Sequence, residues 1–204
     1  MVYTMQNYFE QAKQVWKTES EALAHIREVI TKETFNNVID LLTNNNGRIF
    51  ISGCGTSGMA AKKIAHTLTC VEKPASYLNP ADAIHGGLGV LQKEDILILV
   101  SKGGNTEELL PLLEVAKKKA VTVVGVTENK SSAIGKHVNH LLNVSVPEEP
   151  DMFNMLATAS TLAVIALFDA ISIQLMETTG FTKEQFQIIH PGGAVGDRLS
   201  HDTN

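Results

Sequence analysis

The sequence predicts an α/β fold in which an open, doubly wound sheet of five parallel strands is covered by helices. Two observations predict it. From residue 48 onward, short runs rich in β-branched and aliphatic residues alternate with helical stretches, which is the pattern of right-handed βαβ units. The run at residues 96–100, Ile-Leu-Ile-Leu-Val, is apolar at every position, as a strand buried on both faces of a parallel sheet requires. A chain of 204 residues fits a single domain of this kind.

Helices are expected before the sheet. Apolar residues recur at helical spacing over residues 4–44, Thr31 begins a second helix, and the run Asn-Asn-Asn-Gly at 44–47 ends it. The expected strands are 48–52, 75–78, 95–101, 121–127 and 140–144. The expected later helices are 57–71, 105–119, 131–136, 152–179 and 183–189. We therefore expect one domain over residues 1–204, with N-terminal helices at about 4–45 and an α/β core at about 47–199.

Composition argues against several classes of protein. The formal net charge of −5 is opposite in sign to that of a nucleic-acid-binding surface. The two cysteines form no disulfide pattern, which favours a reducing compartment. The N-terminus has no signal-peptide run, and polar residues interrupt the apolar stretch 156–175, which predicts a buried helix and not a membrane span. The expected location is the cytoplasm.

The first expected strand ends in a glycine-rich loop, Gly-Cys-Gly-Thr-Ser-Gly at residues 53–58, and a helix follows. Such a loop lets a ligand approach the backbone, and the N–H groups at the helix N-terminus attract an anion. Gly55, Thr56 and Ser57 are therefore candidate phosphate-binding residues. The spacing also fits a dinucleotide-binding turn, but that motif expects an acid at the end of the second strand, and Asp82 lies beyond a proline. A tight turn with no ligand is a further alternative.

A second loop of the same kind follows the third expected strand. Residues 101–108 read Ser-Lys-Gly-Gly-Asn-Thr-Glu-Glu, and the candidate phosphate-binding residues are Ser101, Gly103, Gly104 and Thr106. Because neighbouring parallel strands bring their carboxyl ends to one edge of the sheet, the two loops should meet where the strand order reverses. Together they suit a phosphate monoester. The alternative for the two hydroxyls is ordinary capping of strand and helix ends.

The two loops, together with His-Pro-Gly-Gly at 190–193 and Ala-Asp-Ala-Ile-His-Gly at 81–86, resemble the sugar isomerase (SIS) family, and within it the arabinose-5-phosphate isomerase branch. The resemblance covers about residues 10–199. It implies a flavodoxin-like three-layer α/β/α sandwich and a homodimer or homotetramer with active sites shared between subunits. Members of the branch often continue into paired CBS domains, whereas this sequence ends at Asn204, so we expect either a single-domain member or part of a longer protein.

The resemblance also implies which residues act. Phosphate contacts fall on Ser57, Ser101, Gly103, Gly104 and Thr106. The polar catalytic group maps to His85, Glu108, Glu149 and His190. The sequence departs from the branch at three positions, with Thr56 in place of a lysine, Gly87 in place of an aspartate and Gly103 in place of a serine.

Aldose–ketose isomerisation needs a base that moves a proton between adjacent carbons through an enediolate. We expect Glu149 to be this base, because a partly desolvated carboxylate between Pro147 and Pro150 could have a pKa raised toward neutrality. Glu148 is the alternative base, and an acidic loop in solvent is the structural alternative for both. His190 suits ring opening, because histidine titrates near neutral pH, or it caps a helix end.

The other candidate groups are open to two interpretations each. His85 donates to a sugar oxygen or has a structural role, and Glu108, expected in the first turn of its helix, orients a neighbour or favours the helix dipole. Lys102 is expected to be a solvated charge. The histidines show no metal-ligand pattern, and enediol chemistry needs neither metal nor cofactor. The leading hypothesis is a phosphosugar isomerase, with arabinose 5-phosphate and ribulose 5-phosphate as candidate substrates. The alternative is a non-catalytic phosphosugar or nucleotide-sugar sensor.

Overall fold

The computed structural model describes residues 7–192, and within them the chain forms a parallel sheet of five strands in the order β2-β1-β3-β4-β5. The strands are β1 (Ile49–Gly53), β2 (Ala75–Tyr77), β3 (Ile96–Val100), β4 (Thr122–Thr127) and β5 (His140–Asn143). The chain moves outward from β1 to β2 and then returns to the other side of β1 to form β3. The order therefore reverses between β1 and β3, as predicted for a doubly wound sheet.

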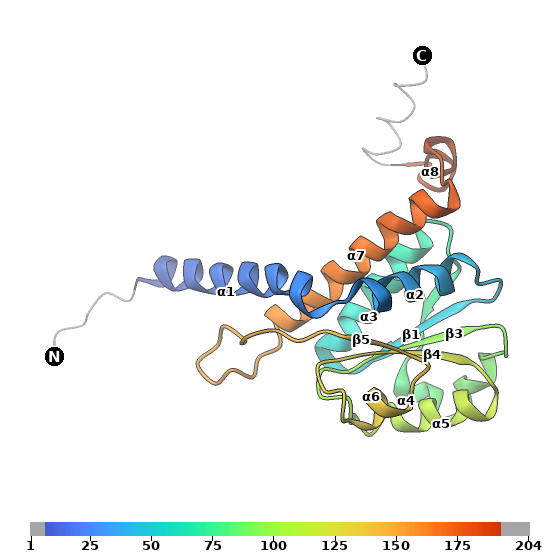
Figure 1. Ribbon diagram of the computed structural model, residues 1–204, viewed down its shortest axis with the longest axis horizontal. Coiled ribbons are helices and arrows are strands. Elements are labelled where there is room, and N and C mark those ends of the chain that lie inside the picture. The colour runs from blue at the N-terminus through green and yellow to red at the C-terminus, as the bar shows by residue number, and fades with distance from the viewer. Residues whose placement is uncertain (1–6, 193–204) are drawn as a thin grey trace, which may run out of the picture.

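Helices cover both faces of the sheet and make it the middle of three layers (Figure 1). One face carries α1 (Tyr8–Val29), α2 (Lys32–Thr43), α3 (Gly55–Thr69) and α7 (Ala159–Thr179). The other face carries α4 (Pro80–Ala83), α5 (Leu110–Lys118) and α6 (Ala133–His137), with a short 3-10 turn at Gly87–Val90. The last helix, α8 (Lys183–Ile189), lies beyond the C-terminal end of α7. The predicted α/β fold is confirmed.

Alternating side chains of the strands fill two cores. In β3, Ile96, Ile98 and Val100 belong to the core under α2, α3 and α7. Leu97 and Leu99 belong to the core above α5 and α6. Because successive strand residues point to opposite faces, only a continuous apolar run can satisfy both layers, and this is why β3 has no polar position.

Two helices begin five or more residues later than the sequence predicted. Helix α5 starts at Leu110 and not at residue 105, because Pro111 lacks an N–H and fits only the first turn of a helix. Helix α7 starts at Ala159 and not at residue 152. The segment before it forms a loop in which the Asp151 carboxylate accepts hydrogen bonds from the N–H groups of Phe153 (2.9 Å), Met155 (2.8 Å) and Leu156 (2.7 Å).

Helix α7 is long and apolar enough to cross a membrane by length and composition. The core helix of a globular domain meets the same criteria, and α7 packs against α1, α2 and α3. Its buried positions, which include Ala163, Leu167 and Ile171, recur at helical spacing on the face toward the sheet.

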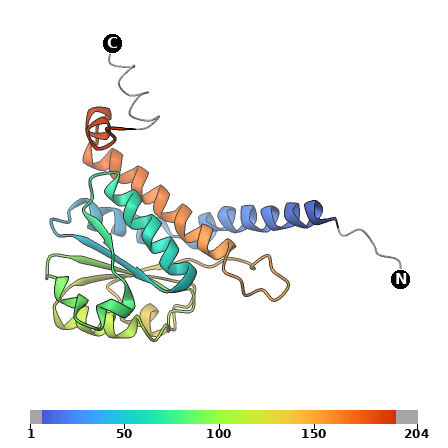
Figure 2. The same cartoon turned by 180° about the vertical axis from the view of Figure 1, so that it is seen from behind.

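Helix α1 projects from the rest of the domain, and both views show its N-terminal half without a neighbour (Figures 1 and 2). It exposes Tyr8, Phe9, Trp16 and Leu23. The loop before α7 lies on the same side and exposes further large apolar residues, Met152, Phe153, Met155 and Leu156. The domain thus presents apolar surface on the side where α1 and this loop emerge.

Candidate active site

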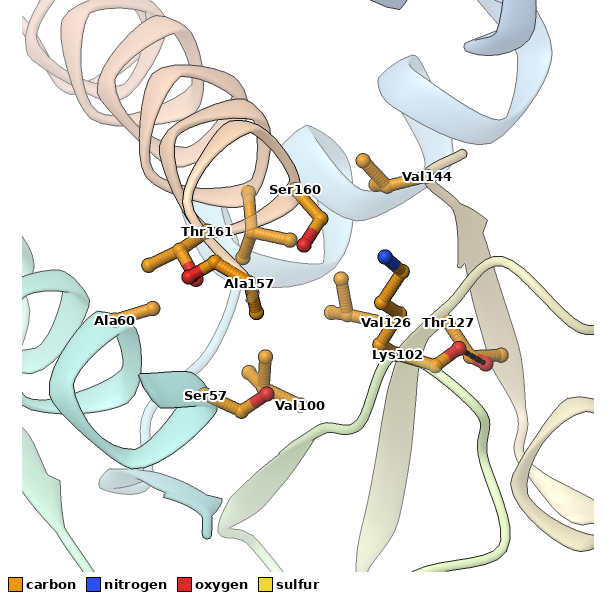
Figure 3. Close-up of a pocket in the computed structure, with 11 residues that line it drawn as sticks. Ser57, Ala60, Val100, Lys102, Val126, Thr127, Val144, Ala157, Ser160 and Thr161 are labelled. Carbon is orange, nitrogen blue, oxygen red and sulfur yellow. Dashed lines mark hydrogen bonds between the residues drawn. The ribbon is translucent and has the colours of Figure 1, made fainter. Parts of the chain in front are cut away.

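The two glycine loops meet at the carboxyl edge of the sheet. Gly53, at the end of β1, is in register with Val100, at the end of β3. A pocket opens between the loops and the N-terminus of α7, with an aliphatic floor (Figure 3). Its polar lining consists of Ser57, Lys102, Thr127, Ser160 and Thr161. The predicted convergence of the two loops is therefore present in the fold.

The first loop leads directly into α3. Cys54 occupies the N-cap position without a capping side-chain hydrogen bond, so backbone N–H groups of the first turn stay free to bind an anion. Gly55 has φ +55° and faces open space. Thr56 is exposed, and Ser57 is half-buried and lines the pocket. This geometry leaves the loop accessible to a ligand.

The second loop is held by its own hydroxyl groups. The Oγ of Ser101 lies 2.7 Å from the Oγ1 of Thr106 and accepts a hydrogen bond from the N–H of Gly104 at 3.0 Å. Ser101 is buried, whereas Gly103 is exposed and faces open space. Gly104 has φ +72°, and a Cβ there would lie 2.0 Å from the Oγ of Ser132. Ser101 and Thr106 thus shape the loop, and Gly103 leaves its backbone accessible.

The buried carboxylate of Glu149 lies beside this pocket. It is 3% exposed and accepts hydrogen bonds from the Nζ of Lys102 at 2.7 Å, from the N–H of Thr158 at 3.0 Å and from the N–H of Ser160 at 3.4 Å. The Ser160 hydroxyl also donates to it. The Glu149 N–H donates to the Oδ1 of Asn154 at 2.6 Å, which fixes the backbone of the loop. Glu149 is therefore held by groups from the second glycine loop, the loop before α7 and the N-terminus of α7.

This environment corrects the expected titration of Glu149. Burial on its own raises the pKa of the Glu149 carboxyl, but the hydrogen bonds from Lys102, Ser160 and Thr158 outweigh it, so the pKa lies below its usual value. The expectation of a pKa raised toward neutrality is wrong for this structure, because the sequence did not show that a cation and the α7 N-terminus lie against the carboxylate.

Lys102 and Ser160, whose side chains hydrogen-bond to Glu149, are among the site residues that the sequence reasoning missed. Lys102 was expected to be solvated, but its ammonium group pairs with Glu149. The sequence did contain a signal, because Lys102 lies two residues after a buried strand, at the sheet edge where both loops lie. Ser160 gave no such signal, since the predicted start of its helix was seven residues too early.

The remaining candidates lie outside the pocket lining. Glu148 is exposed, in contrast to its neighbour Glu149, and His85 is exposed in the turn after α4. Glu108 lies in a turn before α5 and not in the first helical turn as expected. Burial, and secondly the Glu108 carboxylate, raises the pKa of the Cys54 thiol, which places Glu108 near the first loop.

His190 is not near Glu149 within one chain. It follows α8, at the far end of α7 from the pocket (Figure 1). Helix α7 has 21 residues and is roughly 30 Å long at about 1.5 Å per residue. The His190 ring stacks on Phe186 with centroids 4.0 Å apart, and its Nδ1 lies 2.9 Å from the Phe186 carbonyl oxygen. The predicted turn at 190–193 is described only as far as Gly192.

Over residues 7–192, no group of three or more His, Cys, Asp or Glu side chains is arranged to hold a metal ion. The cysteines in that range are unpaired. What the pocket offers is a cation, hydroxyl groups and free N–H groups beside a buried carboxylate, which is a set of groups for binding an anion and moving a proton.

A doubly wound parallel sheet with two glycine-rich loops at its switch point is the architecture of α/β domains that bind phosphate-bearing ligands. More particularly, the SIS domain family matches residues 41–173, and the chain belongs to this family. The predicted resemblance is confirmed.

Relatives and solved structures support the same family. A Listeria monocytogenes protein described as a candidate sugar-phosphate isomerase is 52% identical, with a TM-score of 0.90 over 92% of this chain and 98% of that chain. An Escherichia coli CFT073 protein solved in complex with arabinose 5-phosphate is 28% identical, with a TM-score of 0.85 over 92% of this chain and 99% of that chain. The arabinose 5-phosphate isomerase KdsD of Pseudomonas aeruginosa is 38% identical over 82% of this chain and 51% of its own length. This chain spans 51–62% of the length of the curated relatives that it matches.

Proposed function

We propose that this chain is an aldose–ketose isomerase that acts on a phosphorylated sugar. The observation that carries the proposal is the convergence of the two loops with the buried Glu149 carboxylate at one pocket. The similarity to arabinose 5-phosphate isomerases and to a structure in complex with arabinose 5-phosphate supports arabinose 5-phosphate and ribulose 5-phosphate as the substrate pair. A cytoplasmic location is part of the same proposal.

The proposed binding mode starts from the free backbone donors. The phosphate lies between the N-terminus of α3, with Gly55, Thr56 and Ser57, and the second loop, with Gly103 and Gly104. Ser101 and Thr106 hold the second loop in its conformation through their hydrogen bonds. N–H groups arranged around an anion bind it without requiring side chains to reorganise.

In the proposed mechanism, Glu149 removes the proton from the carbon next to the aldose carbonyl. The electron pair forms a cis-enediolate, and the same carboxyl group returns the proton to the neighbouring carbon, while a hydroxyl proton moves between the two oxygens. The product is the ketose. Among the two adjacent acids we assign this role to Glu149, because it is buried beside the pocket whereas Glu148 faces solvent.

We further propose that the site is completed by a second copy of the chain in a homodimer or homotetramer. His190 ends α8, which follows the C-terminus of α7, whereas Glu149 contacts Thr158 and Ser160 at the N-terminus of α7, so within one chain His190 cannot assist ring opening there. The exposed apolar residues of α1 and of the loop before α7 lie on the pocket side of the domain and supply a surface for such contact. His85 and Glu108 are then groups at the rim of the shared site.

One observation favours the alternative, a phosphosugar-binding sensor without turnover. Glu149 is held as an ion pair with Lys102, and a carboxylate stabilised in this way is a weak base. A sensor would bind phosphosugars and leave them unchanged, whereas an isomerase would convert them.

The test is a panel of pentose and hexose phosphates, including arabinose 5-phosphate and ribulose 5-phosphate, followed by NMR for conversion. The wild-type chain should equilibrate one aldose–ketose pair, and Glu149→Gln should lose about 10²-fold or more of the rate. Glu148→Gln should keep the activity. Binding without conversion of any sugar phosphate would leave only the sensor.

A further inference from the structure

Lys102 stands out in the pocket because the proposed mechanism gives it no task. Its ammonium group points into the pocket toward Ser160 (Figure 3). The Lys102 side chain is 34% exposed, whereas that of its partner Glu149 is 0% exposed. A ligand entering the pocket therefore reaches the ion pair from the lysine side.

The pocket needs a cation that the rest of its lining does not supply. Among the residues that line it, Lys102 is the one that carries a charge. The first loop, residues 53–58, contains no lysine or arginine. A phosphate monoester carries about −1.5 to −2 charges at neutral pH, and hydrogen bonds to it are stronger when the donor is charged.

We propose that Lys102 is a binding residue that exchanges partners: its ammonium group leaves Glu149 and pairs with the phosphate of the bound sugar. The proposal rests on the proposed function, because it takes a phosphosugar as the ligand. The lysine side chain has the four-carbon reach and rotational freedom for such a change. Glu149 is not stranded by the exchange, since it keeps the Ser160 hydroxyl and the N–H groups of Thr158 and Ser160.

The exchange couples binding to base strength. Over the described residues, the charged group that acts on the Glu149 carboxylate is Lys102, and the other groups against it are neutral donors from Thr158 and Ser160. When the cation leaves, burial weighs more heavily and the pKa of Glu149 rises. The empty pocket thus holds a weak base, and the occupied pocket holds a stronger one.

Binding of inorganic phosphate and of arabinose 5-phosphate, measured by calorimetry, tests the exchange. Lys102→Met should weaken phosphate binding about tenfold or more, and Lys102→Arg should recover part of the loss. Glu149→Gln should tighten binding about threefold or more, because the competing carboxylate charge is gone. Lys118→Met, on the exposed face of α5, removes the same charge away from the pocket and should bind phosphate like the wild type.

Lys102→Met alone leaves the buried Glu149 carboxylate without its counter-ion and so risks unfolding the protein. The double variant Lys102→Met with Glu149→Gln removes both charges and provides the test in that case. It should lack the tighter binding of Glu149→Gln. The proposal is wrong if Lys102→Met binds phosphate as tightly as the wild type. It is equally wrong if the double variant binds phosphate as tightly as Glu149→Gln, because Lys102 is then only the counter-ion of Glu149.

A second readout follows the carboxylate itself. Carbon-13 NMR of glutamate side chains, with the Glu149 signal assigned from Glu149→Gln, should show its pKa rising when phosphate is added to the wild type. Phosphate should have no such effect in Lys102→Met. These measurements need no turnover, so a chain that binds phosphate through Lys102 but isomerises nothing would contradict the proposed function alone. A chain that isomerises normally with Lys102→Met would contradict the partner exchange alone.

Discussion

At the scale of single residues, Glu149 shows how a buried acid keeps its charge. Burial disfavours a carboxylate, but four donors from Lys102, Thr158 and Ser160 surround this one. These donors also favour the ionised form, so the carboxylate contributes to folding stability in its charged state. The same contacts that hold the acid in place therefore determine how it responds to pH.

The depressed pKa of Glu149 predicts a pH-dependent stability difference. Its contribution is fully present above the unfolded pKa of about 4.3 and is lost as the pH falls through that value toward the lower folded pKa. Glu149→Gln should therefore cost on the order of 1–3 kcal/mol near pH 7 and progressively less below about pH 4. Thermal melts from pH 7 to pH 3 measure this.

The exposed neighbour provides the control. Glu148→Gln should change the melting temperature little at any pH, because surface charges contribute little to stability. A gap between wild type and Glu149→Gln that stays constant or widens on acidification would contradict the arrangement of donors around Glu149.

The adjacent glycines of the second loop give a second prediction at this scale. Gly104→Ala should destabilise the protein by about 2 kcal/mol or more, since it combines a strained backbone with a Cβ 2.0 Å from the Oγ of Ser132. Gly103→Ala faces open space and should fold like the wild type. Equal unfolding free energies for the two variants, measured with denaturant, would show that the loop has another conformation.

At the scale of elements, the loop before α7 brings Glu149 to the pocket. Asp151 organises this loop by accepting three backbone hydrogen bonds, and Asn154 accepts one from Glu149. The N-terminus of α7 then presents Thr158 and Ser160 to the carboxylate. The position of the acid therefore depends on where α7 begins.

Asp151→Ala should loosen this loop without unfolding the domain. Amide hydrogen exchange over residues 152–158 should become faster, because the N–H groups of Phe153, Met155 and Leu156 lose their acceptor. Exchange in β1 and β3 should stay slow. Unchanged protection of the loop amides would mean that Asp151 does not hold them.

The strands could be predicted from sequence more reliably than the loops. The run at 96–100 could only be a strand buried on both faces, and the meeting of the two loops followed from strand order. The start of α5 was also readable, since Pro111 marks a first helical turn. The start of α7 could not be predicted from the sequence, because it depends on contacts of Asp151 and Glu149 that form only on folding.

The candidate site shows the same difference between local sequence patterns and contacts that form only on folding. The positions of the two glycine loops could be predicted, because the glycines follow the strands directly in the sequence. The pairing of Lys102 with Glu149 joins positions 47 residues apart, and no local pattern encodes it.

At the scale of the whole molecule, α1 and His190 are the observations behind the proposal that a second copy of the chain completes the site. Helix α1 extends from the body (Figures 1 and 2) and exposes a group of large apolar side chains. Exposed apolar surface of this kind marks interaction sites. In the proposed homo-oligomer, a second copy covers this surface, and its His190 is the candidate group that completes the pocket.

Trp16→Glu should therefore shift the protein toward monomer and lower isomerase activity at least about tenfold, while leaving phosphate binding in place. Glu28→Gln, at an exposed position of the same helix, is the control. Light scattering combined with the activity assay measures both effects. A variant that is monomeric and fully active would contradict the shared site.

The most direct test of the account is a titration of the nitrogen-15-labelled chain with arabinose 5-phosphate, followed by backbone NMR. The account predicts that amides 55–57 and 103–106 shift together and saturate with a single dissociation constant, because both loops bind the same phosphate. Shifts confined to one loop, or different dissociation constants for the two, would contradict it.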